Sequence, residues 1–436
     1  MILKIERVLR IGVFIFIAVI VGAEETTLIV PPFSHTLGIN RVSSFHFNLY
    51  FSDFKIDDPQ GIWAIKFRED DDTTTVRDDH ILTILAVNSG QGQIVYNQGL
   101  LKIEIFGKKG SGEGEFLFPK GITAHRDNLV FVADWGNDRI VQLRYQGKKL
   151  HWDKVFFSPV VKPYGVAVDT KKNVYFTEPE SSLIYVCDSL GNIIRVIKED
   201  ISYPTAIAVI DRNDPNNFYG EEFLAVVDFR NKRLQKFSLS GKLLEYTDVR
   251  GIGMNEAEFS YIAIDYYGNI FATDTVLNCI HKFDRFLNYL TSFGREGSGK
   301  GEFYKPRGIT IARKYGQVFI TEKTGGQYYW AGLDSYFLGF FPDSFTLEKP
   351  GTTIALYLTD ISEVSLSIFD EKGNLVRETS PFITSQAGEV LIAWDGRDKK
   401  GEIVKPGKYQ LKITCRLPYG GGKRFRKEMG GYVYVQ

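Results

Sequence analysis

Six acidic or amide residues recur along the middle of the chain, and each one ends a short apolar segment. In chain order they are Asn88, Asp134, Glu178, Asp228, Asp274 and Glu322, with successive spacings of 46, 44, 50, 46 and 48 residues. Carboxylates gathered in one place can bind a metal ion or act as a general acid and base. At strand ends, however, Asp and Asn commonly accept backbone hydrogen bonds in tight turns. Because the residue recurs in every copy, whereas an active site usually breaks such symmetry, we expect a structural role.

Histidines and nucleophiles give little support for a catalytic centre. His125, His151 and His281 fall at non-equivalent positions of the repeat, and no pair of histidines has the short spacing of metal ligands. The three cysteines are far apart and form no CxxC pair, and the Gly-x-Ser-x-Gly pattern is absent. We therefore predict no metal and no cofactor. The many acids leave a hydrolase or lyase open as the alternative to a binding protein.

Two glycine-rich stretches invite comparison with phosphate-binding loops. FGKKGSGEGEFLFPKGI (106–122) and FGREGSGKGEFYKPRGI (293–309) are identical at 11 of 17 positions. A phosphate-binding loop opens a helix, but here the glycines lead into Phe, Pro and an apolar strand. The two copies lie 187 residues apart, which is four periods of 46 to 47 residues. We interpret them as equivalent connections in a repeating fold.

A second motif, Pro-x-Gly-(Ile/Val), opens another short strand in each unit. Its glycines are Gly61, Gly121, Gly165 and Gly308, and weakened copies occur at 204–207 and 259–262. Six units of about 47 residues, each with about four short strands, predict an all-β fold with a six-bladed β-propeller over residues 57–341.

The repeat resembles the NHL family. FVADWGNDRIVQL (131–143) is similar to the family phrase VADxxNxRI, and it follows a glycine-rich lead, Phe and Pro-x-Gly-Ile. The resemblance implies a six-bladed propeller, which agrees with the number of units. Proteins with similar propellers include a peptide-amidating lyase with metal-bound histidines and the RNA-binding tripartite-motif proteins, so the resemblance leaves catalysis and RNA binding as alternatives to be weighed.

Residues 342–436 alternate apolar and polar residues, which predicts an Ig-like antiparallel β-sandwich. The stretch WDGRDKKG (394–401), followed by VKPGKY (404–409), resembles the Ig-like module named for the flagellar hook-capping protein. We expect Trp394 to pack between the sheets, and Gly396 and Gly407 to belong to its turns. The residues give no reason to expect a hook-capping role, and the module is predicted to be a spacer, an anchor or a sorting module.

The N-terminus resembles an export signal. A basic start is followed by IGVFIFIAVIV (11–21) and small residues, which predicts cleavage after about Ala23. An uncleaved anchor is the alternative. No second apolar run exists, so we expect a secreted, periplasmic or cell-surface protein with no membrane span after cleavage. The segment 24–56 contains RVSSFHFNLYF (41–51), which we expect to add a strand to the last blade or to cap the ring.

Binding is the function that these observations favour. The chain has 53 basic and 53 acidic residues, and together with export this argues against a nucleic-acid partner. In antiparallel blades, turns between the second and third strands share a face with the connections between blades. We expect that face to carry exposed aromatic and cationic side chains that anchor a ligand. The alternative is that these side chains form only a solvated rim. The anchors are Lys120, Trp135, Tyr164, Phe229, Arg307 and Lys323. We expect a monomeric, non-catalytic scaffold for a protein or polysaccharide ligand.

Overall fold

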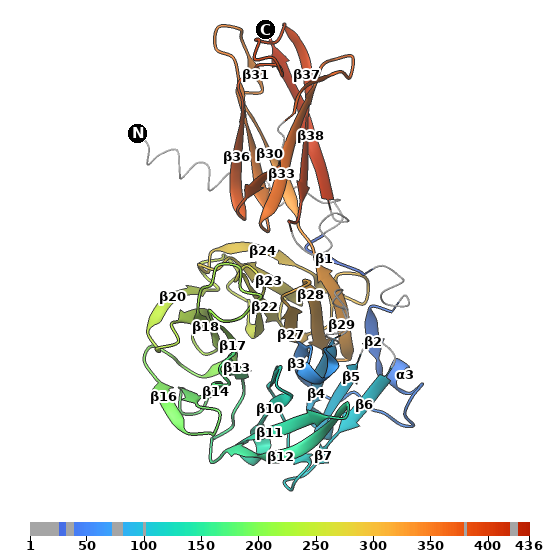
Figure 1. Cartoon of the computed structure of the whole chain (residues 1–436), viewed down its shortest axis with the longest axis vertical. Helices are drawn as coiled ribbons and strands as arrows, with labels where there is room; N and C mark the ends of the chain where they lie inside the picture. The colour runs from blue at the N-terminus through green and yellow to red at the C-terminus, as the bar shows by residue number, and fades with distance from the viewer. Residues whose placement is uncertain (1–25, 32–38, 72–81, 99–101, 379–381, 419–425) are drawn as a thin grey trace.

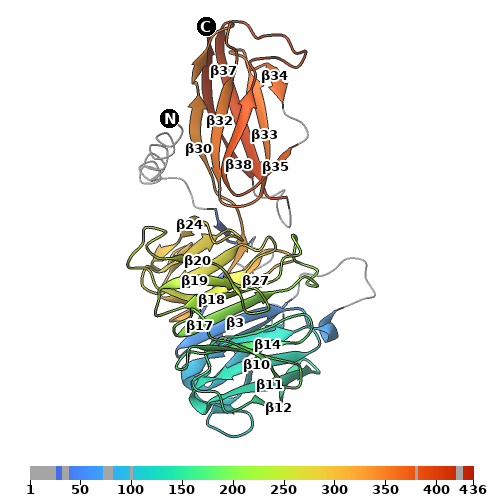
Figure 2. The same cartoon turned by 90° about the vertical axis from the view of Figure 1, so that its left-hand side faces the viewer.

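The computed structural model describes residues 26–31, 39–71, 82–98, 102–378, 382–418 and 426–436. The predicted signal peptide, residues 1–23, lies outside these ranges. The described chain forms a ring of β-sheets that carries an elongated β-sandwich (Figures 1 and 2). The predicted fold class, a β-propeller followed by an Ig-like sandwich, is confirmed. Within the described residues, no helix has the length and apolar character needed to cross a membrane.

Within the described residues, six antiparallel sheets, here called blades, follow one another around the ring. Blade 1 contains β3 (Pro59–Ile65), β4 (Thr83–Asn88), β5 (Gln93–Gln98) and β6 (Lys102–Phe106). Blade 2 contains β9 (Ile122–His125), β10 (Leu129–Asp134), β11 (Arg139–Gln146) and β12 (Lys149–Phe157). Blade 3 contains β13 (Val166–Val168), β14 (Val174–Glu178), β15 (Leu183–Cys187) and β16 (Ile193–Ile197). Blade 4 contains β17 (Pro204–Ile210), β18 (Phe223–Asp228), β19 (Arg233–Phe237) and β20 (Leu243–Asp248). Blade 5 contains β21 (Phe259–Ile264), β22 (Ile270–Asp274), β23 (Cys279–Phe283) and β24 (Tyr289–Phe293). Blade 6 contains β27 (Pro306–Ala312), β28 (Gln317–Glu322) and β29 (Gly325–Ala331).

The N-terminal segment supplies the outer strand of blade 6. Both β1 (Leu28–Ile29) and β2 (Arg41–Ser43) pair antiparallel with β29. The strand expected within 41–51 is only three residues long, because the chain turns at once into the single-turn helix α3 (Ser44–Phe47). Arg41 Nη1 lies 2.8 Å from Glu322 Oε1, which ties the segment to the end of β28.

Glycines of the Pro-x-Gly motif lie where the inner strand of one blade meets the next. A Cβ on Gly308 would lie 2.3 Å from the backbone oxygen of Gln60, and one on Gly61 would lie 2.7 Å from that of Lys120. Gly121 and Gly165 make the same approach to the blades that follow them. Because any side chain would collide with backbone here, glycine permits the inner strands to pack around the axis.

The two glycine-rich stretches form the same kind of loop. Each closes with a short parallel pair, β7 (Lys108–Lys109) with β8 (Glu115–Phe116) and β25 (Arg295–Glu296) with β26 (Glu302–Phe303). Within the loops, the Glu115 carboxylate accepts the N–H of Gly112 at 2.9 Å, and Glu302 accepts that of Gly299 at 2.7 Å. The chain's own carboxylates therefore occupy N–H groups that a phosphate would need.

Hairpin turns repeat a sequence signal of their own, Asp-x-x-x-Asn. In each turn the Asp Oδ1 accepts the backbone N–H of the Asn at 2.8 to 2.9 Å, which closes the loop as Asx turns do. The pairs are Asp169–Asn173, Asp188–Asn192, Asp265–Asn269, Asp284–Asn288 and Asp370–Asn374.

In the part of the C-terminal sandwich that the structure describes, the strands form two sheets. One contains β30 (Ser335–Phe341), β32 (Thr352–Leu358) and β36 (Gly388–Trp394). The other contains β31 (Ser344–Phe345), β38 (Arg426–Val435), β37 (Gly407–Arg416), β33 (Ser362–Phe369), β34 (Leu375–Glu378) and β35 (Ile383–Ser385). Trp394 is buried between them, with ring centroids of Phe345 and Tyr409 at 5.4 and 5.6 Å.

A buried ion pair joins the sandwich to the ring. Lys282 Nζ of β23 lies 2.7 Å from Asp360 Oδ2, in the turn after β32, and both side chains are almost fully inaccessible to solvent. Tyr357 of β32 also donates its hydroxyl to the backbone oxygen of Leu290 in β24, at 2.8 Å. These contacts fix the sandwich against blade 5.

Candidate functional site

Side chains from several blades converge at the Pro-x-Gly corners. We call the group the corner cluster: Asp58, Gln60, Lys120, Tyr164, Tyr261 and Arg307. Arg307 of blade 6 donates to the Asp58 carboxylate and, at 3.2 Å, to the backbone oxygen of Pro59. Lys120 Nζ lies 3.4 Å from Asp58 Oδ2, and Gln60 Nε2 donates to the same oxygen at 3.0 Å. One carboxylate therefore holds two cations from different blades.

Tyrosines complete the cluster from the other side of the ring. Tyr261 of blade 5 occupies the position that glycine takes in the intact motif, and its side chain is buried. Its hydroxyl donates to Gln60 Oε1 of blade 1 at 2.9 Å, and its ring centroid lies 5.7 Å from that of Tyr164. Tyr164 is itself half-buried.

The charges of the corner cluster stabilise one another. Burial acts to raise the pKa of Asp58, but the hydrogen bond from Arg307 and the charges of Lys120 and Arg307 outweigh it, so that this pKa is lowered. Burial lowers the pKa of Lys120, and Asp58 opposes that shift. The side chains of Lys120 and Arg307 keep 17% and 20% of their exposure, so solvent still reaches them. With two cations and one carboxylate, the cluster can accept an anionic group.

Each of the other predicted anchors follows the second strand of its blade. Trp135 begins the 3-10 turn after β10 and lies beneath Lys162 Nζ, 4.6 Å from the ring centroid. Phe229 follows β18 and packs against Tyr203, with centroids 6.1 Å apart. Lys323, after β28, lies over the ring of Tyr304 at 5.5 Å. The structure therefore brings Lys120, Tyr164 and Arg307 together, and gives Trp135, Phe229 and Lys323 separate neighbours.

The six residues that end the second strands accept hydrogen bonds from the backbone of the connection that leads into their own blade. Each side chain accepts a backbone N–H at 2.7 to 3.2 Å from a residue that precedes the first strand. The acceptor and donor pairs are Asn88 and Asp57, Asp134 and Leu117, Glu178 and Val161, Asp228 and Ser202, Asp274 and Glu258, and Glu322 and Tyr304. These oxygens are engaged within the fold rather than directed together at one centre.

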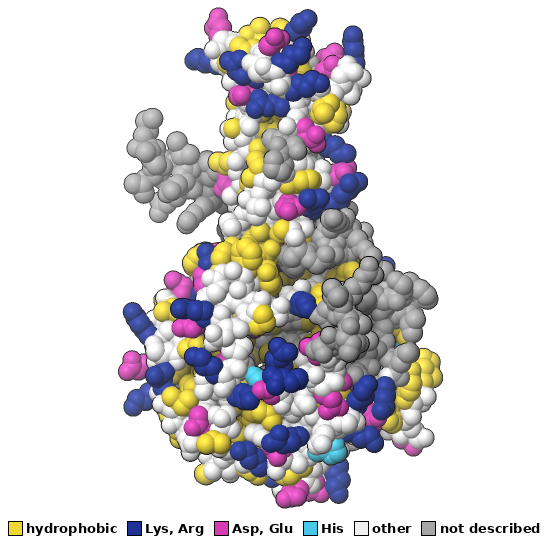
Figure 3. Space-filling model, viewed as in Figure 1, with side chains coloured by type: hydrophobic (Ala, Val, Ile, Leu, Met, Phe, Trp, Pro, Cys, Tyr) yellow, Lys and Arg dark blue, Asp and Glu magenta, His cyan; other side chains and the backbone are white. Residues whose placement is uncertain are grey.

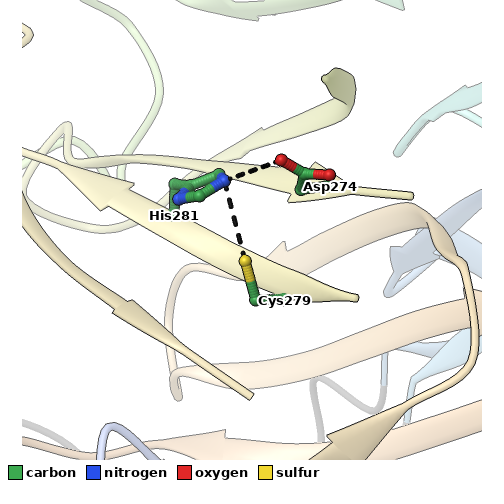
Figure 4. Close-up of side chains that lie close together, drawn as sticks. All are labelled: Asp274, Cys279 and His281. Atoms are coloured by element: carbon green, nitrogen blue, oxygen red, sulfur yellow. Dashed lines mark hydrogen bonds and ion pairs between the residues drawn. The ribbon is translucent and has the colours of Figure 1, made fainter. Parts of the chain in front are cut away.

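Blade 5 contains a cluster of three side chains that sequence reasoning missed (Figure 4). His281 Nε2 lies 3.1 Å from Asp274 Oδ2 and 3.7 Å from Cys279 Sγ. All three side chains are buried, so the cluster offers no surface to a substrate. The spacing between histidines does not reveal this cluster, whereas the pattern Cys279-x-His281 after a strand that ends in Asp274 does.

Asp58, Gln60 and Tyr261 were also missed as site residues. Gln60 stands at the same motif position as Lys120, Tyr164 and Arg307, so the repeat register alone could have found it. The position of Tyr261 in the motif is hard to recognise from the sequence, because this copy has neither the proline nor the glycine.

A cavity of about 270 Å³ lies between blades 1 and 6, under the N-terminal segment. Its lining is mostly apolar and includes Phe47, Ile62, Ile84 and Phe319. On the molecular face in Figure 3, acidic and basic side chains are intermingled over the ring. Hydrophobic side chains gather on that face where the ring meets the sandwich.

Comparison with known proteins identifies the family of the C-terminal sandwich and gives weak structural similarities for the rest. Residues 343–416 match the FlgD Ig-like domain family. A selenomethionine-substituted virginiamycin B lyase from Staphylococcus aureus is 14% identical, with 57% of this chain and 76% of that chain covered and a TM-score of 0.41. A streptogramin B lyase is 14% identical, with coverage of 64% and 94% and a TM-score of 0.44. A catalytically inactive virginiamycin B lyase from Staphylococcus aureus with quinupristin is 15% identical, with coverage of 73% and 95% and a TM-score of 0.40. No curated protein matches the sequence. Structural similarities at this level carry no argument about this chain.

Proposed function

We propose that this chain is an exported, non-catalytic propeller of the six-bladed NHL type that binds a protein or glycan ligand through its top face, the face with the Pro-x-Gly corners. The phrase FVADWGNDRIVQL (131–143) and the recurrence of the strand-ending residues support the NHL assignment. The Ig-like module serves as a spacer, anchor or sorting module, and the protein acts as a monomer without a nucleic-acid partner.

The corner cluster is the observation that carries this proposal. Lys120 and Arg307 come from separate blades and meet at one carboxylate, yet both keep access to solvent. Two cations beside one anion leave a net positive charge, and Arg forms paired hydrogen bonds to carboxylates. The ligand therefore carries an acidic group, such as a uronic acid or an acidic side chain.

Binding fits these contacts better than catalysis does. A general base needs a free oxygen within reach of its substrate, but the Asp58 carboxylate already accepts bonds from Gln60, Lys120 and Arg307. The strand-ending residues are likewise engaged with backbone. A hydrolase or lyase at this face remains the competing outcome of the tests.

Arrays of acidic and neutral glycans and peptides test the proposal. We expect the mature protein to bind acidic members in a salt-dependent manner, because the attraction to Lys120 and Arg307 is screened by ions. Arg307→Gln should reduce this binding by at least tenfold. The matched control, Lys149→Gln, removes an exposed charge from the outer strand of blade 2 and should leave binding unchanged. Equal binding by the two variants, or a preference for neutral ligands, would contradict the proposal.

Export has its own test. N-terminal sequencing of the protein recovered from an expressing cell should begin near Glu24, in a fraction outside the cytoplasm. A cytoplasmic protein that retains Met1 would contradict export.

A further inference from the structure

The cluster in blade 5 contains three different potential metal ligands on one hairpin. Asp274 ends β22 and pairs directly with Cys279, the first residue of β23. His281 lies two residues further along β23, so its side chain points to the same face of the strand as that of Cys279. Their nitrogen, oxygen and sulfur atoms lie within 4.8 Å of one another (Figure 4).

Three side chains supply ligands, and two of the three separations between their ligand atoms suit one tetrahedral metal ion. Zinc bonds of about 2.3 Å to sulfur and about 2.0 to 2.1 Å to nitrogen and oxygen place S and N about 3.5 Å apart, and N and O about 3.3 Å apart. The corresponding separations here are 3.7 Å for Cys279 Sγ to His281 Nε2 and 3.1 Å for His281 Nε2 to Asp274 Oδ2. Each differs from the expected value by only about 0.2 Å.

Among the described residues of blade 5, no arginine stands beside the strand-ending carboxylate, and its basic neighbour is the imidazole of His281 at 3.1 Å. In blade 2, Asp134 pairs with Arg139 at 2.8 Å, and in blade 4, Asp228 pairs with Arg233 at 2.7 Å. Cys279 occupies the position of that arginine in blade 5. A buried carboxylate is costly without a counter-charge. A divalent ion bound by one carboxylate, one thiolate and a neutral imidazole gives a site with no net charge.

Neighbouring groups already orient the ligands. Ser292 Oγ lies 2.6 Å from His281 Nδ1, so that Nδ1–H can donate to it and leave the Nε2 lone pair facing the other two residues. The N–H groups of Val276 and Leu277 each donate to Asp274 Oδ1 at 2.8 Å, and Oδ2, which also accepts the N–H of Glu258 at 2.9 Å, faces the imidazole. Such outer contacts are typical of metal-binding histidines and carboxylates.

We propose that Asp274, Cys279 and His281 form a buried structural site for a divalent transition metal ion of the Zn²⁺ class. The ion cross-links β22 to β23 in the blade that contacts the sandwich through Lys282. The inference is independent of the ligand-binding function proposed above. It predicts stoichiometric metal rather than catalysis, because the side chains are closed to solvent.

Metal analysis of the mature full chain tests the site. After purification without affinity resins that release metal, and exhaustive dialysis, elemental analysis should find about one zinc ion per chain. Chain that is stripped of metal and reloaded with Co²⁺ should show a thiolate-to-cobalt charge-transfer band in the near ultraviolet. Zn²⁺ should also raise the Tm of the stripped protein.

Cys279→Ala is the diagnostic variant, and Cys187→Ala, which removes another buried cysteine, is its matched control. The first should lose the charge-transfer band and the response of Tm to Zn²⁺, whereas the second should keep both. The inference is overturned if the wild-type chain shows no cobalt–thiolate band, or if Cys279→Ala retains metal and band at wild-type levels. The wild-type spectrum decides the matter even if the variant fails to fold.

Discussion

Replacing Lys282 with methionine tests how the sandwich is held to the ring. The side chains of Lys282 and Asp360 are only 1% and 0% exposed, and Nζ lies 2.7 Å from Oδ2. Methionine keeps most of the apolar stem and removes the charge. The Asp360 carboxylate is then buried without its cation, which makes this a test of charge rather than of packing.

The expected loss is large. Breaking a buried ion pair by removing one partner costs about 3–5 kcal/mol in the free energy of unfolding. For a ring of about 300 residues that unfolds with about 2.1 cal/mol/K per residue, this lowers Tm by about 5–8 °C. Asp360→Asn should cost less, because Asp265 can then balance Lys282. Burial and the Asp360 charge together raise the pKa of Asp265 to about 7, so removing that charge favours an ionised Asp265.

Differential scanning calorimetry of the mature chain measures these changes. Lys412→Met is the control, because Lys412 forms a 2.7 Å pair with Glu428 in which both side chains are substantially exposed. Exposed pairs contribute about 0–1 kcal/mol, so that variant should unfold close to the wild type. The reasoning is refuted if Lys282→Met lowers Tm no more than Lys412→Met does, or if Asp360→Asn is the more damaging change.

Three further changes probe the ring. Gly308→Ala should lower the free energy of unfolding by about 1–3 kcal/mol, because its Cβ would lie 2.3 Å from the Gln60 backbone oxygen. The control Gly112→Ala should be tolerated, because its Cβ would meet only the end of the Glu115 side chain. Equal losses for the two variants in denaturant titrations would contradict this reasoning. Because the pKa of Asp265 is raised, its own contribution to the free energy of unfolding is fully present below about pH 4 and falls by up to roughly 4 kcal/mol as the pH rises to about 7. Asp265→Asn should flatten that profile, and an unchanged slope would contradict the assignment. Tyr261→Phe leaves Gln60 Oε1 buried without its donor and should cost about 1–3 kcal/mol in chemical unfolding, so a neutral result would refute the role given to that bond.

Repeat spacing predicted the fold because it reports on backbone geometry. The Pro-x-Gly corners and the strand-ending residues recur at one period, since every blade needs the same close approach and the same turn. That register predicts that Lys120, Tyr164 and Arg307 lie on one face, and in the structure they meet in the corner cluster. The sandwich was predicted equally well from Trp394 and its flanking turns.

Features outside the repeat could not be predicted in the same way. Asp58 lies before the Pro-x-Gly motif, so the motif does not indicate that it pairs with Lys120 and Arg307. Lys282 and Asp360 are 78 residues apart, in different domains, and no sequence pattern links them. The cluster of Asp274, Cys279 and His281 depends on the register of β22 against β23, which spacing between histidines does not report. The N-terminal strand β2 is short because its sequence continues into a helical turn rather than alternating further.

A single titration tests the central claim most directly. An acidic ligand selected from the arrays is titrated into the wild-type chain and into Arg307→Gln by calorimetry, and the ligand recovered afterwards is weighed by mass spectrometry. Our account predicts one site per chain, binding weakened at least tenfold in the variant, and a ligand of unchanged mass. Undiminished binding in Arg307→Gln, or a ligand that the wild-type chain has cleaved, would contradict it.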